Sequence, residues 1–452
     1  MEHSVLSNET LYNLCKEFHD NHCIDAEKYT RYDIKRGLRN ADGSGVKAGI
    51  TLISNVHGYV LNEGEKEPIE GSLVYRGINI KDLVNGCVKD NRFGFEETAW
   101  LLLFGTLPTA EQLAAFSELL SNSRELPNYF AEDMIIKAPS PNIMNNLARS
   151  VLALYAYDDK ADDISLPNVL RQCIELIAML PSIMAYAYQV KRRQYDKKSM
   201  FFHPVKSGLS TSELILRMIR SDAKFTPDEA RLLDICLMLH AEHGGGNNST
   251  FATRVLSSSG TDTYSAIGGA IGSLKGPRHG GANIKVMQML EQIKAGVKNW
   301  ESDGEVADFL TRIIHKKEGD GSGLIYGMGH AVYTLSDPRA VILKKYAYDL
   351  AEKKGFGDEF RLLERIERLT PEVFAREKAN TKTMCANVDM YSGLVYKTLG
   401  ISEDLFTPLF AVARMPGWCA HRMEELQAGA RIIRPAYKAL VREKKYTPID
   451  ER

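Results

Sequence analysis

The segment Leu274-Lys275-Gly276-Pro277-Arg278-His279-Gly280-Gly281-Ala282-Asn283 predicts a turn between two helices. The residues before it, from Ser265 to Leu274, are mostly small and apolar, and two of them are glycines that allow close contact with another helix. The residues after it, from Ile284 to Ile293, repeat apolar side chains at helical spacing. His279 is therefore predicted in a tight turn, at or near the N-terminus of the second helix.

The positive end of a helix disfavours an imidazolium ion. A neutral His279 could then act as an electrophile toward a carbonyl oxygen. A histidine that only caps the turn is the simpler alternative, and this segment alone leaves both open.

Helical patterns continue almost throughout the chain beyond about residue 90. Thr109 and Gln112 occupy the two positions of a capping box. Thr226 can cap a second helix, and Pro227 suits its first position. These signals predict an all-α fold built from helices of ordinary length.

Two segments are exceptions to this simple helical pattern. The β-branched runs at 49–53 and 58–61 predict one small pair of strands. The apolar segment 168–190 contains Arg171 and Pro181, which predicts two buried helices rather than a membrane span.

The bulk composition predicts a soluble protein of two domains. The chain has 452 residues, beyond the size at which a single hydrophobic core stops growing. Apolar residues make up 44% and charged residues 25%, as in ordinary globular proteins. With 57 basic and 58 acidic side chains, the protein lacks the basic surface of a nucleic-acid-binding protein.

Cysteine usage and the first residues predict a cytoplasmic location. Seven cysteines lie far apart without a CxxC pair, which favours reduced packing residues over a redox or zinc role. The sequence Met1-Glu2-His3-Ser4 begins neither a signal peptide nor a transit peptide. We therefore expect no association with a membrane.

His240 and His243 are predicted on one face of the helix that begins after Thr226. Three glycines from Gly244 onward would end this helix, which places the histidines at its edge. A packed pair of core histidines is an equal alternative. A zinc site needs more ligands than this pair supplies, and the HExxH motif is absent.

Glycine-rich segments at 319–323 and 327–330 surround His330. They would let the backbone approach a ligand and would leave His330 exposed on a flexible loop. Neither a GxGxxG motif nor a P-loop is present. Arg339 follows a turn fixed by proline, so it is either a rigid ligand-binding guanidinium or part of a structural ion pair.

Three charged residues near the C-terminus complete the candidates. Asp389 lies in a mostly uncharged segment, 384–393, so partial burial could raise its pKa toward that of a useful base. Arg414 and Arg434 are the others. Considered alone, each is more often structural than functional.

Five segments follow one another in an order typical of one family. They are 240–247, 274–283, 327–339, 387–393 and Arg414-Met415-Pro416-Gly417-Trp418. Together they resemble the citrate synthase family, and the likeness runs from Leu73-Val74-Tyr75-Arg76-Gly77 to Arg434-Pro435.

The resemblance implies an all-α fold with a large helical domain, an inserted smaller one, and an active site in the cleft between them. The large domain would comprise residues 1–284, with an N-terminal arm of about 1–55, and residues 391–452. The small domain would comprise 285–390. A homodimer with shared active sites is also implied.

The resemblance further implies a reaction between acetyl-CoA and oxaloacetate. Asp389 would remove a methyl proton while His279 stabilises the thioester oxygen, and His330 would polarise the ketone. Acetyl-CoA is a poor carbon acid, so base and electrophile must act together.

The substrate carboxylates would be bound by His243, Arg339 and Arg414, with Arg434 reaching in from the second subunit. Arginine suits this task because its planar fork pairs bidentately with carboxylates. CoA would leave as a product, and no cofactor or metal is expected.

Two other functions stay open from the sequence. A 2-methylcitrate synthase would use propionyl-CoA with the same residues, since one methylene discriminates by only about 1–3 kcal/mol. A zinc hydrolase on His240, His243 and Glu242 is the alternative from another class.

Overall fold

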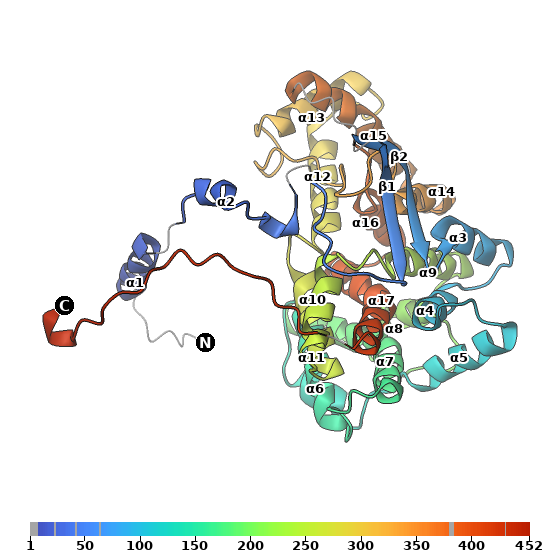
Figure 1. The fold of residues 1–452 in the computed structure, drawn as a ribbon. Coiled ribbons are helices and arrows are strands. Elements are labelled where there is room, and N and C mark those ends of the chain that lie inside the picture. The colour runs from blue at the N-terminus through green and yellow to red at the C-terminus, as the bar shows by residue number, and fades with distance from the viewer. Residues whose placement is uncertain (1–7, 22–23, 41–42, 63–64, 379–383, 430) are drawn as a thin grey trace. The chain divides into compact units, whose positions relative to one another are not determined.

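The computed structural model describes residues 8–21, 24–40, 43–62, 65–378, 384–429 and 431–452. The chain divides into two units, which Figure 1 draws together in one ribbon. Residues Met1–Ala48 and Arg434–Arg452 form the first, here called the arm unit. Residues Gly49–Ile433 form the second, here called the body.

The arm unit has no hydrophobic core among its described residues. It contains α1 (Asn8–Asn21), α2 (Glu27–Arg31) and two short 3₁₀ turns, Arg36–Leu38 and Ile449–Glu451. Its apolar side chains are exposed, including Leu11, Tyr12, Leu14 and Phe18 of α1. The N-terminal arm of about 1–55 stays a prediction.

The body begins with a three-stranded antiparallel sheet in the order β1-β2-β3. The strands are β1 (Ser54–Asn62), β2 (Glu65–Tyr75) and β3 (Ile78–Asn79). The predicted pairing of 49–53 with 58–61 is wrong. Ile53 is buried in the core and the Leu52 N–H donates to the Glu424 carboxylate, so this stretch is held outside the sheet.

Helices form the rest of the body, which confirms the all-α prediction. They are α3 (Ile80–Lys89), α4 (Phe95–Phe104), α5 (Ala110–Asn122), α6 (Ile143–Leu154), α7 (Leu166–Gln194), α8 (Thr211–Ile219), α9 (Pro227–His240), α10 (Asn248–Ser258), α11 (Thr263–Lys275), α12 (Ala282–Gly296), α13 (Asp303–Ile314), α14 (Pro338–Lys353), α15 (Gly357–Lys378), α16 (Asp389–Thr398) and α17 (Phe406–Gln427). Both predicted helix starts are present: Thr109 and Thr226 each complete a capping box, with Gln112 and Glu229.

The predicted pair of helices at 168–190 is one continuous helix, α7, with Pro181 inside it. α7 packs against α17, α6 and α8. Among the described residues it is the one helix long and apolar enough to cross a membrane, and 78% of its most apolar window is buried inside the body. It therefore has the character of a core helix.

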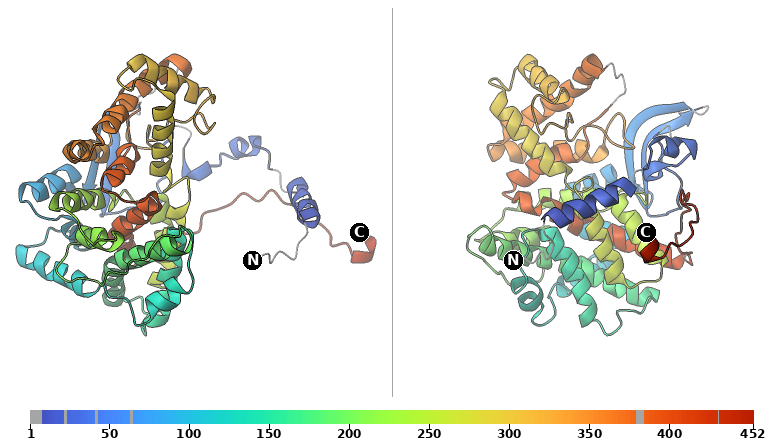
Figure 2. Two further views of the ribbon diagram at one scale, coloured as in Figure 1. Left: turned by 180° about the vertical axis from the view of Figure 1, so that it is seen from behind. Right: turned by 90° about the vertical axis from the view of Figure 1, so that its left-hand side faces the viewer.

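The helices of the body fall into two groups in space (Figures 1 and 2). α12–α16 gather at one end, where α12 and α14 pack on α16 and α13 packs on α15. α6, α7, α10 and α11 surround α17 at the other end. The domain boundaries at 284/285 and 390/391 stay a prediction.

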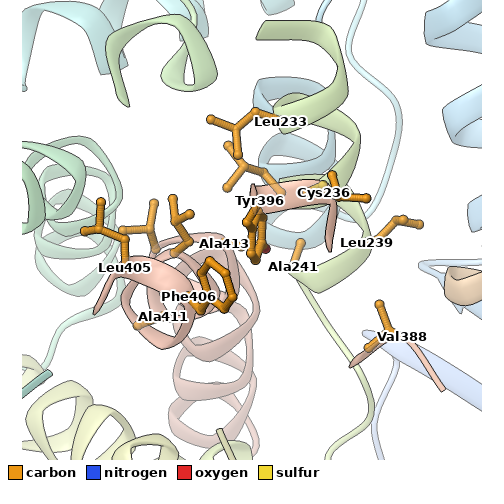
Figure 3. Close-up of a cluster of buried hydrophobic side chains, with 14 of the residues drawn as sticks. Leu233, Cys236, Leu239, Ala241, Val388, Tyr396, Leu405, Phe406, Ala411 and Ala413 are labelled. Atoms are coloured by element: carbon orange, nitrogen blue, oxygen red, sulfur yellow. The ribbon is translucent and has the colours of Figure 1, made fainter. Parts of the chain in front are cut away.

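A buried cluster joins α9, α16 and α17 (Figure 3). Its labelled members are Leu233, Cys236, Leu239, Ala241, Val388, Tyr396, Leu405, Phe406, Ala411 and Ala413. Several of them adjoin candidate site residues in the chain: Leu239 precedes His240, Val388 precedes Asp389, and Ala413 precedes Arg414. The core thus fixes the three backbones that carry these side chains.

Candidate active site

His243 lies in a loop and not on the face of α9 that the sequence predicted. The helix ends at His240, before the glycines. The Tyr75 hydroxyl lies 3.1 Å from the Met238 carbonyl oxygen and 3.0 Å from that of Glu242. It therefore occupies acceptors of the last turn, and the chain leaves the helix there.

The Glu242 carboxylate anchors the loop that carries His243. Its Oε1 accepts hydrogen bonds from Ser54 Oγ at 2.9 Å, from the Gly244 N–H at 2.6 Å and from His421 Nε2 at 3.0 Å. Arg254 donates to the other ring nitrogen of His421. Glu242 is therefore engaged in a buried network, and the described residues contain no group of three or more possible metal ligands.

The loop that carries His330 is joined to the segment that precedes Asp389. Met328 and Ala386 form a β-bridge. The Gly329 N–H donates to the Cys385 carbonyl oxygen at 2.8 Å, and the Asn387 N–H donates to that of Gly327 at 2.8 Å. These bonds bring two segments about sixty residues apart in sequence to one place.

His330 is half-buried and held, whereas the sequence predicted an exposed residue on a flexible loop. Its Nδ1 accepts hydrogen bonds from the backbone N–H groups of Val332 at 3.0 Å and Tyr333 at 3.1 Å. In the neutral ring the proton therefore lies on Nε2. The ring centroid is 5.2 Å from that of His243.

Arg339 is paired in a bidentate manner with Asp337, the N-cap of α14. Its Nε and Nη2 lie 3.0 and 2.7 Å from the two carboxylate oxygens, and both residues are buried. Asp337 also accepts the N–H of Val388 at 3.2 Å. The predicted ion pair thus exists, and it fixes the guanidinium next to the start of α16.

Asp389 is the first residue of α16 and is half-buried. Burial raises the pKa of its carboxyl to about 6, although the nearby Arg339 opposes the rise. The sequence predicted this rise in pKa, because the segment around Asp389 is mostly uncharged.

His279 lies in the turn between α11 and α12, as predicted. Its Nε2 is 3.0 Å from Ser249 Oγ, which also accepts the Trp418 indole N–H at 3.1 Å. Burial, and then the Arg414 cation, lower the pKa of His279 to about 4. The ring is therefore neutral at physiological pH.

Arg414 is fully buried in the middle of α17. Its Nε donates to the His240 carbonyl oxygen at 2.6 Å, while Nη1 and Nη2 have no hydrogen-bond partner among the described residues. Burial lowers its pKa to about 10. A buried guanidinium with two unpaired nitrogens is costly unless an anion joins it, so this residue marks an anion site.

The structure brings together the predicted site residues of the body. Arg414 lowers the pKa of both His279 and His243, and Arg339 lowers that of His243 and Asp389. Arg434 belongs to the arm unit, so its role stays a prediction.

Tyr333 also lies in this site and was not predicted from the sequence. Its hydroxyl lies 3.1 Å from His243 Nε2, and its ring stacks on His330 with centroids 4.6 Å apart. An aromatic residue three positions after the histidine was the available signal, but spacing alone does not distinguish it from core packing.

Known proteins resemble the chain over most of its length. Residues 41–436 match the family described as citrate synthase, C-terminal domain. A citrate synthase from Synechocystis is 34% identical over 87% of this chain and 88% of its own. A 2-methylcitrate synthase from Shewanella oneidensis is 32% identical over 91% of this chain and 95% of its own.

A solved structure shares the fold. It is a ternary complex of carboxymethyl coenzyme A and oxaloacetate with the citrate synthase of Thermoplasma acidophilum. The TM-score is 0.73, with 26% identity, over 93% of this chain and 99% of the other. The fold, the family match over residues 41–436 and the gathered histidines, arginines and aspartate agree, and the chain belongs to the citrate synthase family.

Proposed function

We propose that this protein condenses acetyl-CoA with oxaloacetate and water to give citrate and CoA. The observation that carries the proposal is the combination in one site of a carboxyl with a raised pKa, Asp389, a neutral His279 and a buried, unpaired Arg414. Family membership supports the same reaction.

Enolisation is the first chemical step. The ionised Asp389 removes a proton from the methyl group of acetyl-CoA, and the electron pair moves onto the thioester oxygen. His279, held by Ser249, stabilises that oxygen by hydrogen bonding. A neutral imidazole suits this task, because its N–H is a weak acid close in pKa to the enol. It can donate a hydrogen bond to the thioester oxygen without first becoming an imidazolium.

Carbon–carbon bond formation follows. The enolate carbon attacks the ketone carbon of oxaloacetate, and the ketone oxygen takes the Nε2 proton of His330 and becomes the hydroxyl of citryl-CoA. His243, Arg339 and Arg414 bind the carboxylates, and the two Nη atoms of Arg414 gain hydrogen-bond partners when the dicarboxylate is present. Water then cleaves the thioester, which releases citrate and CoA.

The wider context is also proposed. The protein acts in the cytoplasm as a homodimer, with Arg434 of each chain completing the site of the other, and it needs no cofactor or metal. The arm unit supports this assembly, because its apolar side chains lack a core and need a surface to cover them.

A thiol-release assay tests the function. Oxaloacetate is mixed with acetyl-CoA or with propionyl-CoA, and free CoA is measured for the wild type and for Asp389→Asn. We expect rapid release with acetyl-CoA and at least tenfold higher kcat/KM than with propionyl-CoA, within the range that one methylene allows. A preference for propionyl-CoA would establish the 2-methylcitrate synthase instead, and no release with either would refute the proposal.

A further inference from the structure

Tyr333 packs against His243 and His330, the two histidines assigned to the dicarboxylate, and is 2% exposed. Its hydroxyl is 3.1 Å from Nε2 of His243. Its ring stacks on that of His330 at an interplanar angle of 28°, and the Arg339 guanidinium carbon lies 5.9 Å from the ring centroid. One residue thus contacts three members of the site.

We propose that Tyr333 is a positioning residue that fixes which nitrogen of His243, and which nitrogen of His330, carries the proton. The inference rests on the proposed function, since it concerns the same dicarboxylate site. Neither histidine can be an effective donor to the substrate if its proton is on the wrong nitrogen.

The tautomer of His243 follows from the needs of the Tyr333 hydroxyl. Burial and the cation of Arg339 keep His243 neutral by lowering its pKa. Burial also raises the pKa of Tyr333, so the phenol keeps its proton. The described residues offer that hydroxyl no other hydrogen-bond partner, and burying it unpaired would be costly. The hydroxyl therefore donates to Nε2, and His243 carries its own proton on Nδ1.

The tautomer of His330 is set by the backbone of Tyr333 together with that of Val332. The Tyr333 N–H donates to His330 Nδ1, which leaves the proton on Nε2. The side chain of Tyr333 thus orients one histidine while its main chain orients the other. A shift of this residue would disturb both donors together.

Two glycines, one in β1 and one in β2, leave the space that Tyr333 occupies. The register of β1 and β2 is irregular between His57 and Tyr59, so Gly58 lies in a bulge. A methyl group added at Gly58 would lie 2.5 Å from the Val332 carbonyl oxygen and 2.7 Å from the Cα of Tyr333. One added at Gly71 would overlap the Ser336 carbonyl oxygen and lie 2.8 Å from Cδ1 of Tyr333. Side chains at these positions would push the residue away from the histidines.

The test compares Tyr333→Phe with Tyr348→Phe. The first removes the hydroxyl and keeps the stacked ring. The second removes a hydroxyl that is bonded to Arg361 on an exposed surface. We expect Tyr333→Phe to raise the KM for oxaloacetate about five- to tenfold, the usual worth of one buried hydrogen bond. The KM for acetyl-CoA should stay within about twofold, and Tyr348→Phe should change neither constant.

A double-mutant cycle separates positioning from a general loss of structure. Because Tyr333 acts through His243, its substitution should add less than twofold to the KM for oxaloacetate in a His243→Ala background. An unchanged KM in the single variant, or an equal factor in both backgrounds, would overturn the inference. Failure of the wild type to release CoA would refute the proposed function instead.

The space left by these glycines is tested by Gly71→Ala, with Gly86→Ala as the control. Gly86 is in α3 and has nothing near its Cβ position. We expect kcat to fall at least tenfold in Gly71→Ala and to be unchanged in Gly86→Ala. If a folded Gly71→Ala variant keeps full activity, Tyr333 does not depend on this space. If Gly71→Ala does not fold, the result for Tyr333→Phe decides whether the inference about Tyr333 stands.

Discussion

Replacing Asp389 with asparagine should stabilise the folded protein while it removes activity. The pKa of this carboxyl is about 6 in the folded state, against an ordinary value of 3.8. Each unit by which the pKa differs between the folded and unfolded states corresponds to about 1.4 kcal/mol. Ionised Asp389 therefore costs the native state about 3 kcal/mol at neutral pH. Asparagine has nearly the same shape and carries no charge to bury.

The sign of the pH dependence follows from proton binding. Below about pH 4 the carboxyl is protonated in both states, and the penalty is absent. As the pH rises from about 4 to 6, the unfolded chain releases the proton before the folded one does, so the wild type loses stability. Above about pH 6 the whole penalty is present. The gain from Asp389→Asn should therefore grow over this interval and then level off.

Urea unfolding at fixed protein concentration, repeated at several pH values, measures this gain. Asp308→Asn is a matched control, because Asp308 is an exposed residue in the middle of α13. The stabilised variant should also lose about 10²–10⁴-fold in kcat, as expected when a positioned base is removed. A variant less stable than the wild type at pH 7, or a gain that does not change with pH, would refute the assignment of a raised pKa.

Three further predictions concern the other site residues. His279→Ala should lower kcat by about 10²–10⁴-fold with the fold intact, measured by CoA release and circular dichroism; near-normal turnover would sink its role in enolisation. Arg414→Leu should raise the KM for oxaloacetate at least tenfold, since a charged hydrogen-bonding partner of the carboxylate is lost; a change confined to the KM for acetyl-CoA would show that the residue was misassigned. Mixing Arg434→Ala with Asp389→Asn subunits should restore activity, because one site of each heterodimer then carries neither defect; heterodimers that stay inactive would mean that each subunit supplies its own Arg434.

The parts of the fold that depend on neighbours in sequence were predictable. Thr109 and Thr226 cap their helices through residues three positions away, so the local pattern contains the whole signal. The continuity of α7 was not predictable in this way. Pro181 removes one hydrogen bond of that helix, and the flanking turns are nevertheless held by burial against α17, α6 and α8.

The candidate site residues could be named from the motifs, but their protonation states and contacts could not be predicted. The sequence places His243 near α9, yet the end of that helix is set by Tyr75, more than 160 residues away. The tautomer of His330 depends on two backbone N–H groups whose direction only the folded loop defines. Tyr333 was missed for the same reason, because its importance lies in what it contacts.

Arg339 and Arg414 illustrate two ways of holding a cation for a dicarboxylate. Arg339 is already paired with Asp337, so its charge is largely compensated and its orientation is fixed before substrate arrives. Arg414 has two unpaired nitrogens, and its nearest compensating charge, Glu242, keeps one carboxylate oxygen equally unpaired. Folding therefore leaves a buried cation that a ligand carboxylate can satisfy, so Arg414 would be the stronger source of affinity in the proposed reaction. Arg339, whose position is set in advance, would contribute orientation in the proposed reaction, with the ketone held against His330. Because the two arginines are held differently, the site can be both rigid and strongly anion-binding. Two arginines of the same kind would not give this combination.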